Sequence, residues 1–119
     1  MSMLYKPAAE GKDVLPPKVG PTSYLGDLFT SDTVPEDQIT CGFFKQVAGE
    51  PLVYTYTYDE MKVILEVDGT FNITDETGYS VDAKQGDVFY FKKGCTITFK
   101  ATGGHGYAWY CGLKQNGVL

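Results

Sequence analysis

The feature that most constrains the fold is the segment GEPLVYTYTYDEMKVILEVDG, residues 49–69, in which tyrosines alternate with valine and threonines. Period-two alternation of aromatic and β-branched residues predicts β-strands. Successive side chains of a strand point to opposite faces, so Tyr54, Tyr56, Tyr58 and Glu60 are expected to share one face, which Lys62 continues. A row of phenols ending in a carboxylate and an amine is more typical of a pocket wall than of a dry core.

Turn residues divide the rest of the chain into short segments of the same kind. Strands are expected over residues 22–30, 39–47, 52–58, 60–67, 70–74, 79–83, 87–91, 95–100 and 105–113. Asp68-Gly69 favours a type I′ hairpin, and the stretch from Asp75 to Gly78 favours a second hairpin. This pattern predicts one all-β sandwich or barrel over residues 22–119, preceded by an extended, proline-rich arm over residues 1–21.

Two segments, residues 49–69 and GDVFYFKKG at 86–94, resemble the two sequence motifs of the cupin superfamily. In the first motif, Tyr54 and Tyr56 stand at the two histidine positions, and Glu60 stands at the glutamate position. Val67 stands where the first motif closes with a glycine. The first motif is therefore similar in spacing but lacks its metal-binding imidazoles.

The second motif keeps its glycines, Gly86 and Gly94, while Lys92 replaces its proline and Ile97 replaces its last histidine. The phrases YDEMKVILE and GDVFYFKKG are similar to small cupins of the ethanolamine-utilisation protein Q and ureidoglycine aminohydrolase types. The resemblance covers roughly the last two thirds of the chain. It implies a double-stranded β-helix, the cupin jelly-roll barrel.

A metal cofactor is not expected. Cupin metal sites offer three imidazoles and a carboxylate, whereas this chain has a single histidine. Phenols are poor ligands near neutral pH because their pKa is about 10. A metal-dependent cupin with degenerate ligands, in which Glu60 and His105 hold the ion with waters, is the alternative.

Three residues are candidates for acid–base catalysis. Glu60 and Lys62 lie two residues apart on one strand face. Burial would raise the pKa of the glutamate and lower that of the lysine, and pairing would oppose both shifts. Either residue could then act as a general acid or base. His105, in GGHGYAWY, is the one side chain with an ordinary pKa near neutrality. The alternatives are a structural ion pair for the first two and a solvated turn histidine for the third.

An aromatic box for a flat, apolar ligand is also expected. Its candidate substrate-binding residues are Tyr54, Tyr56, Phe89, Phe91, Phe99, Tyr107 and Trp109. The alternative is that these rings fill the core of a small barrel, although a buried phenol still needs a hydrogen-bonding partner.

Composition excludes some partners. The net charge is −5 and the chain has no arginine, which argues against nucleic acid. No run is long and apolar enough to span a bilayer, and residues 1–11 lack the apolar region of a signal peptide, so a cytoplasmic location is expected. The three cysteines, Cys41, Cys95 and Cys111, do not form a disulfide framework and predict free thiols.

A homodimer is expected from the face opposite the polar row. Met61, Val63, Leu65 and Val67 form an apolar strip. Either this strip is the core and the polar row is exposed, or the polar row lines the cavity and the strip meets a partner. The motif register favours the second, and a monomer seldom exposes such a strip. Taken together, the residues predict a metal-independent enzyme that binds a small organic molecule and catalyses proton transfer, as an isomerase, dehydratase, lyase or cyclase. The alternative of another class is a non-catalytic ligand-binding or assembly protein.

Overall fold

The computed structural model describes residues 2–119, so Met1 of the predicted arm lies outside it. Seven strands account for most of the ordered structure, and the two helical segments are single 3₁₀ turns, Ala8–Glu10 and Pro35–Asp37. The strands are β1 (Ser23–Thr30), β2 (Thr40–Val47), β3 (Leu52–Thr55), β4 (Glu60–Asp75), β5 (Ser80–Asp82), β6 (Val88–Phe91) and β7 (Thr96–Gly112).

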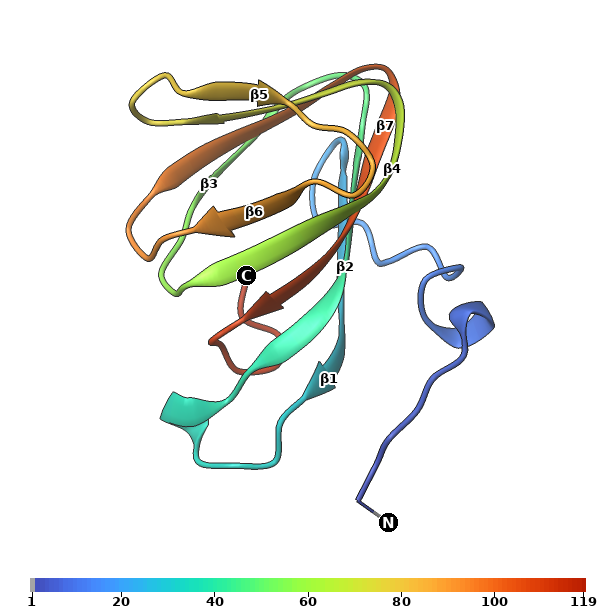
Figure 1. Ribbon diagram of the computed structural model, residues 1–119, viewed down its shortest axis with the longest axis vertical. Coiled ribbons are helices and arrows are strands. Elements are labelled where there is room, and N and C mark those ends of the chain that lie inside the picture. Colours follow the sequence, from blue (N-terminus) through green and yellow to red (C-terminus); the bar gives the residue numbers. More distant parts are fainter. Residues whose placement is uncertain (1) are drawn as a thin grey trace.

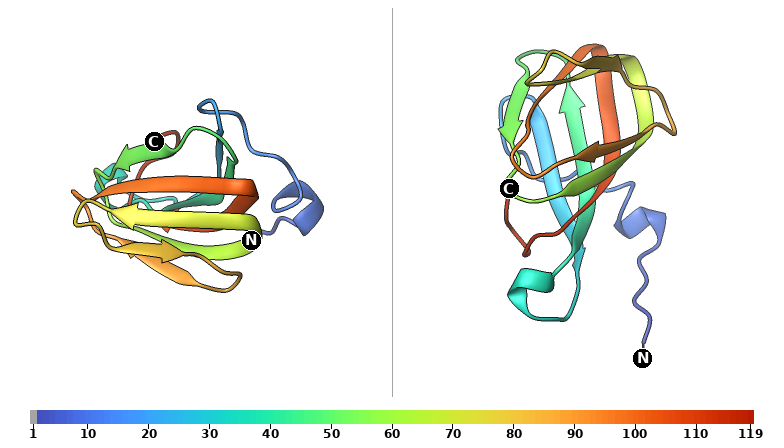
Figure 2. Two further views of the ribbon diagram at one scale, coloured as in Figure 1. Left: turned by 90° about the horizontal axis from the view of Figure 1, so that it is seen from above. Right: turned by 60° about the vertical axis from the view of Figure 1, so that its left-hand side comes forward.

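Two long strands, β4 and β7, are shared by both halves of the barrel (Figure 1). The first half of β4 pairs with the second half of β7, and this pair continues outward to β2 and β1 on one side and to β6 on the other. The remaining halves of β4 and β7 pair between β3 and β5. The chain therefore folds into two antiparallel layers that face each other, as Figure 2 shows from two further directions. The predicted all-β jelly roll is confirmed.

The core lies between these two layers and is mainly aromatic. Phe71 and Phe99 are almost completely buried, and their rings stack with centroids 6.3 Å apart. Ile64, Ala108 and Tyr110 approach them from the opposite layer. Burial of such large rings supplies most of the hydrophobic stabilisation of a small domain.

The hairpin predicted at Asp68-Gly69 is wrong. Strand β4 runs through this point, and its register with β7 shifts between Asp68 and Thr70. Gly69 has a φ of 74°, and a Cβ placed on it would come 2.3 Å from the carbonyl oxygen of Thr102. The glycine thus forms a bulge at which the paired strands bend from one layer to the other, rather than a turn that ends a strand.

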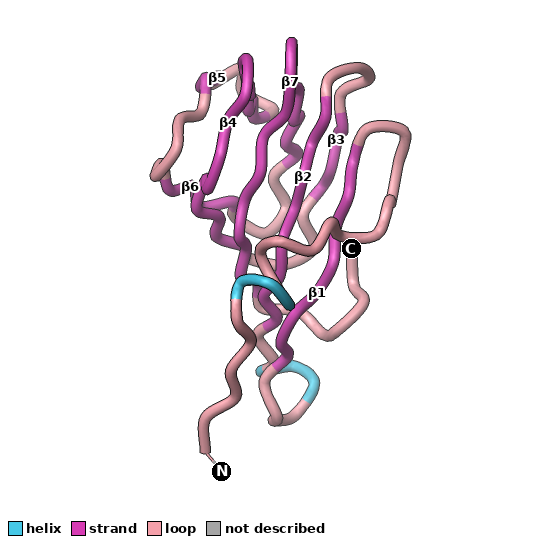
Figure 3. Tube along the Cα trace, turned by 90° about the vertical axis from the view of Figure 1, so that its right-hand side faces the viewer, coloured by secondary structure: helices cyan, strands magenta, loops and turns pink. Residues whose placement is uncertain are grey.

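The segment that leads into β1 runs along the barrel edge beside that strand, as Figure 3 shows. The amide of Leu25 donates to the carbonyl of Pro17 (2.9 Å), and the amide of Val19 donates to the carbonyl of Ser23 (2.9 Å). Farther out, the hydroxyl of Tyr107 donates to the carbonyl of Lys12. The division into an arm over residues 1–21 and a barrel over 22–119 remains a prediction.

Neither of the two 3₁₀ turns within residues 2–119 is long and apolar enough to cross a membrane.

Candidate functional site

A cavity of about 120 Å³ opens between the two layers, inside the barrel. Its wall is mostly apolar, and its polar groups come from the row predicted on one strand face. The lining residues are Val19, Leu25, Phe44, Leu52, Tyr54, Tyr56, Tyr58, Glu60, Lys62, Phe99 and Leu119. The volume suits a small organic molecule.

An ion pair forms the charged part of this wall. Lys62 Nζ lies 3.0 Å from Glu60 Oε2, and both side chains are about 3% exposed. The two residues begin β4, where the alternation that exposes Met61 turns them inward. The orientation predicted for the polar row is therefore the one observed.

Aromatic rings enclose the Lys62 amine. Its Nζ lies 4.8 Å from the ring centres of Phe44 and Tyr110 and 5.7 Å from that of Phe99. Burial lowers the pKa of Lys62, and the Glu60 carboxylate opposes that shift. Ring faces and a carboxylate together stabilise an ammonium ion that water does not reach.

Three phenols complete the polar wall. The Tyr54 hydroxyl donates to the Tyr58 hydroxyl at 3.2 Å. The rings of Tyr54 and Tyr56 meet edge to face, with centroids 4.7 Å apart. Burial, and then the nearby Glu60 carboxylate, raise the pKa of Tyr56 and of Tyr58 well above the usual value. These phenols therefore keep their protons at neutral pH.

A second buried pair lies next to the first. Lys114 Nζ contacts Asp27 Oδ1 at 3.1 Å, and Tyr110 donates to the same oxygen at 2.6 Å. Although burial acts to raise it, the pKa of Asp27 is held below its usual value by hydrogen bonds from Tyr110 and Gly117 and by the Lys114 charge. The Tyr110 ring is close to both amines: its centre is 4.8 Å from Lys62 Nζ and 5.1 Å from Lys114 Nζ. The positive charge of Lys114 also acts to lower the pKa of Lys62.

Five predicted site residues meet in the cavity wall, and two more stand behind it. The five are Tyr54, Tyr56, Glu60, Lys62 and Phe99. Phe91 stacks on Tyr56 with centroids 5.2 Å apart, and Phe89 stacks on Phe91 at 5.8 Å. Phe89 and Phe91 thus support the phenols from the core rather than line the cavity.

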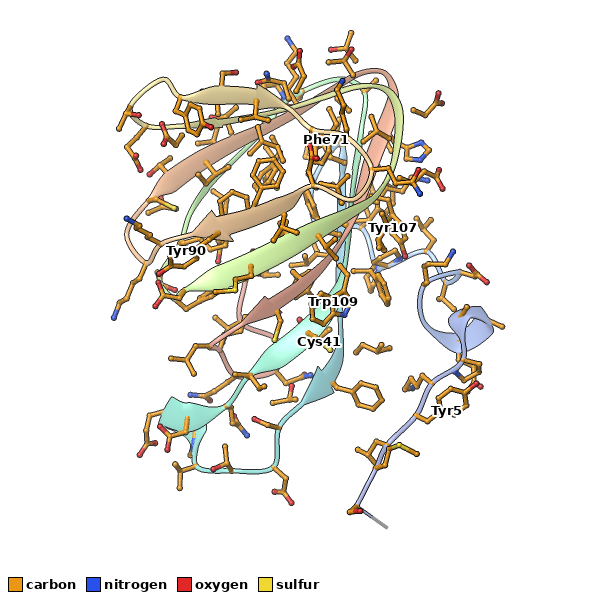
Figure 4. All side chains as sticks on the ribbon, in the orientation of Figure 1. Tyr5, Cys41, Phe71, Tyr90, Tyr107 and Trp109 are labelled. Atoms are coloured by element: carbon orange, nitrogen blue, oxygen red, sulfur yellow. The ribbon has the colours of Figure 1, made fainter. Side chains whose placement is uncertain are left out.

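Three other predicted residues lie on the outer side of β7 instead. Ala108 and Tyr110 are fully buried, so alternation directs His105, Tyr107 and Trp109 outward. Figure 4 labels Tyr107 and Trp109 along this strand. Alternation decides which residues share a face, but which face of the strand is inside depends on its pairing with β2 and β4.

His105 has a different partner from the one predicted. Its Nε2 lies 2.7 Å from Glu66 Oε1, in a surface hollow that Lys12, Lys45 and Tyr107 also line. Because that hollow shares no lining residue with the barrel cavity, His105 is not a counterpart of Glu60.

Several lining residues were missed. Tyr58 lies on the predicted polar face and could have been included from its spacing alone. Phe44 could have been found from the alternation that buries it in β2. Val19 and Leu119 reach the cavity from the two ends of the chain, and nothing in the local sequence signals that placement.

The residues at the cupin metal positions do not fit a metal. Tyr54 and Tyr56 hold their protons because the pKa of each is raised by burial, and Glu60 is occupied by Lys62. Ile97, at the last histidine position, is a buried aliphatic residue. Within residues 2–119 no group of three or more histidine, cysteine or acidic side chains is placed to hold an ion.

We expect protein purified without chelator and then dialysed to retain well under one transition-metal ion per chain. The physical reason is that protonated phenols and an ion-paired carboxylate bind such ions weakly. Elemental mass spectrometry measures the content. Stoichiometric iron, zinc, nickel or manganese that disappears in a Glu60→Gln variant would contradict the expectation.

Comparison with known proteins gives a consistent family. The model of the family described as ethanolamine utilisation protein EutQ matches residues 13–111. A crystal structure of a EutQ protein from Salmonella typhimurium LT2 is 29% identical, with a TM-score of 0.62, over 79% of this chain and 71% of that one. The EutQ protein of Clostridium difficile is 27% identical, with a TM-score of 0.60, over 77% and 68% of the two chains.

A third structure shares the fold over nearly the whole chain. A protein of unknown function from Rhizobium leguminosarum bv. viciae 3841 is 19% identical, with a TM-score of 0.72, over 97% of this chain and all of that one. No curated protein matches the chain significantly.

Proposed function

Because this chain belongs to the EutQ family of cupin-fold proteins, we propose that it binds a small organic molecule inside the barrel and catalyses a proton transfer on it without a metal ion. The reaction would belong to the isomerase, dehydratase, lyase or cyclase type. The sequence of this chain already departs from a metal-binding cupin at Tyr54, Tyr56 and Ile97. The proposal therefore rests on the side chains that replace the metal ligands.

The observation that carries the proposal is the Glu60–Lys62 pair in the cavity wall. Their charged atoms are 3.0 Å apart, and both groups are removed from bulk water although they border a cavity. Placing a carboxylate and an amine there is costly, and replacing such a pair by apolar residues is often stabilising. A buried group with a shifted pKa beside a cleft, here Lys62, is a marker of functional sites.

The roles follow from the chemistry of each group. The Glu60 carboxylate is the base that removes a proton from the substrate, and the Lys62 ammonium, whose pKa is lowered by burial, returns one. The phenols of Tyr54, Tyr56 and Tyr58 donate hydrogen bonds to an oxygen that gains negative charge. A substrate with a carbonyl next to an acidic C–H bond uses all of these groups.

The shape of the site limits the substrate further. Leu25, Leu52 and Phe44 present apolar surface on the remaining wall, and the chain has no arginine for bidentate capture of a phosphate or carboxylate. A compact, neutral carbonyl or hydroxy compound satisfies both conditions.

A non-catalytic ligand-binding cupin is the second candidate. It is favoured by one observation: among the described residues, every fully buried side-chain nitrogen and oxygen already has a hydrogen-bonding partner. In that case Glu60 and Lys62 only satisfy each other, and the cavity holds a ligand without converting it.

Hydrogen–deuterium exchange on carbon separates the two candidates without knowledge of the product. The protein is incubated in D₂O with a panel of small carbonyl and hydroxy compounds, and NMR follows loss of the proton next to the carbonyl. The enzyme proposal expects enzyme-dependent exchange for at least one compound. The binding-protein candidate would be favoured by a compound that binds tightly but shows neither C–H exchange nor conversion.

We further infer that two copies associate through the outer face of the barrel. One row of this face crosses five strands as Phe29, Cys41, Cys111, Met61 and Tyr90, each residue being directly opposite the next. The neighbouring row contains Phe43, Trp109, Val63 and Val88. Neither row contains a charged side chain, and a continuous apolar surface of this extent indicates a protein partner.

The contribution of β4 to this face is shorter than predicted. A register shift between Ile64 and Glu66 exposes Glu66 and turns Val67 toward the core. Met61, which is 55% exposed, and Val63 therefore remain as the β4 part of the surface.

Replacing Met61 with lysine is expected to convert a dimer into a monomer, because two buried ammonium groups would face each other across the symmetric contact. Light scattering at micromolar concentration measures the mass. Val53→Lys is the matched control, because Val53 is similarly exposed (61%) but lies on β3, in the other layer. Wild-type protein that is already monomeric, or a Met61→Lys protein that stays dimeric, would contradict the inference.

A further inference from the structure

Two of the three cysteines face each other across neighbouring strands. Cys41 in β2 lies directly opposite Cys111 in β7 in the antiparallel register. Directly opposed residues of an antiparallel pair have Cα atoms about 4.5–5.5 Å apart and side chains on the same face. This spacing falls within the range of about 4.4–6.8 Å found for disulfides.

Both thiols open onto one apolar hollow of about 450 Å³ on the outer face of the barrel. Phe29, Ile39 and Trp109 line the same hollow, and Figure 4 shows Cys41 and Trp109 near each other at this place. Each cysteine is partly exposed and carries a free thiol. In a single copy of the chain, a small molecule therefore has access to two adjacent thiols.

The third cysteine has a different environment. Cys95 immediately precedes β7 and packs against the core at the far end of that strand from Cys111. It serves as an internal reference within the same chain.

We propose that Cys41 and Cys111 form a reversible redox site that is oxidised to an intramolecular disulfide by low-molecular-weight disulfides. The site is distinct from the barrel cavity, with which its hollow shares no lining residue. The disulfide would link β2 to β7 on the outer face that is proposed above as the dimer contact.

The reaction balances as a thiol–disulfide exchange. One cysteine thiolate attacks a sulfur of the small disulfide, forms a mixed disulfide and releases one small thiolate. The second cysteine then attacks the bonded cysteine sulfur and releases the other small thiolate. The two cysteines lose two electrons and two protons, and the oxidant becomes two thiols.

The rate of this exchange is expected to increase with pH. Burial, followed by the neighbouring Cys41, raises the pKa of the Cys111 thiol. Because only the thiolate reacts, a smaller fraction of Cys111 is reactive at neutral pH than for an ordinary cysteine.

The test incubates reduced full-length protein with a mixture of reduced and oxidised glutathione. Because the proposed dimer covers this face, wild type and the monomeric Met61→Lys variant are treated in parallel. We expect a mass decrease of about 2 Da per chain, which corresponds to the two hydrogens lost, and one remaining thiol of the three. Peptide mapping should join Cys41 to Cys111, and dithiothreitol should reverse the change.

Single variants define the pair. Cys95→Ser should still form the bond, whereas Cys41→Ser and Cys111→Ser should not. The emission of Trp109, the single tryptophan, should fall when the bond forms, because a disulfide quenches a neighbouring indole. If neither wild type nor Met61→Lys forms the bond, or if mapping joins Cys95 to either cysteine, the proposal is overturned.

Discussion

Replacing Glu60 with glutamine is expected to lower the turnover number by about 10²–10⁴-fold, the range that general acid–base catalysis typically contributes. Glutamine keeps the size of the side chain and an oxygen that accepts a hydrogen bond from Lys62, but it has no group that takes up a proton. The affinity for a ligand should change far less than the rate, because the apolar wall and the phenols are untouched. The D₂O exchange assay measures the rate, and calorimetry measures the affinity.

The matched control is Glu66→Gln on the same strand. Glu66 is exposed on the outer side of the barrel, where its partner is His105, so the rate should stay within about a factor of two of wild type. Circular dichroism verifies that both variants are folded. Undiminished exchange in folded Glu60→Gln would remove Glu60 from the mechanism, and an equal loss in Glu66→Gln would show that the effect is not local to the cavity.

Replacing Lys62 with methionine is expected to lower the free energy of unfolding by about 3–5 kcal/mol. Methionine fills much of the space inside the cage of Phe44, Phe99 and Tyr110, so the loss comes mainly from the Glu60 carboxylate, which stays buried without its cation. Urea denaturation measures the change. A loss of this size is a large fraction of the stability of a small domain.

The double variant Glu60→Leu/Lys62→Met should regain most of that stability, because no charge is then left unpaired in the cavity wall. Lys12→Met is the matched control: its pair with Asp13 is more than half exposed, so its loss should lower the free energy of unfolding far less. A Lys62→Met cost equal to that of Lys12→Met would mean that Glu60 is not buried as an anion. A double variant no more stable than Lys62→Met would place the cost in lost packing instead.

Alternation within one segment was enough to predict the central part of the site. A strand repeats every two residues, so the spacing of Tyr54, Tyr56, Glu60 and Lys62 alone put their side chains on one face. The chemistry of those side chains then favoured a cavity, and the structure places all four in its wall. The turns at Asp75–Gly78 and at Gly86 were predicted from their turn-favouring residues, which is also local information.

The same alternation could not decide which face of a strand is inside. In β7 alternation places Tyr107 and Trp109 on one face and Ala108 and Tyr110 on the other. Only pairing with β2 and β4 turns the first set outward. The choice is made by the total apolar surface that two layers bury together, which is a property of segments distant in the sequence.

The bend at Gly69 is likewise decided by strand pairing and not by the local sequence. Asp-Gly favours a hairpin when the two flanking segments pair with each other, but here each flanking segment pairs with β7 instead. Glycine allows the positive φ in either case, so the local sequence does not distinguish a turn from a bulge.

What the sequence determined by itself was the all-β class, the strand faces and the loss of the cupin metal ligands, because each depends on local periodicity or on motif positions. What only the tertiary structure decided was which residues from distant segments meet: Cys41 with Cys111, Asp27 with Lys114, and Val19 and Leu119 at the cavity. The physical reason is that such contacts follow from strand register and from packing between the two layers. Those energies are summed over the whole barrel and leave no periodic trace in any one segment.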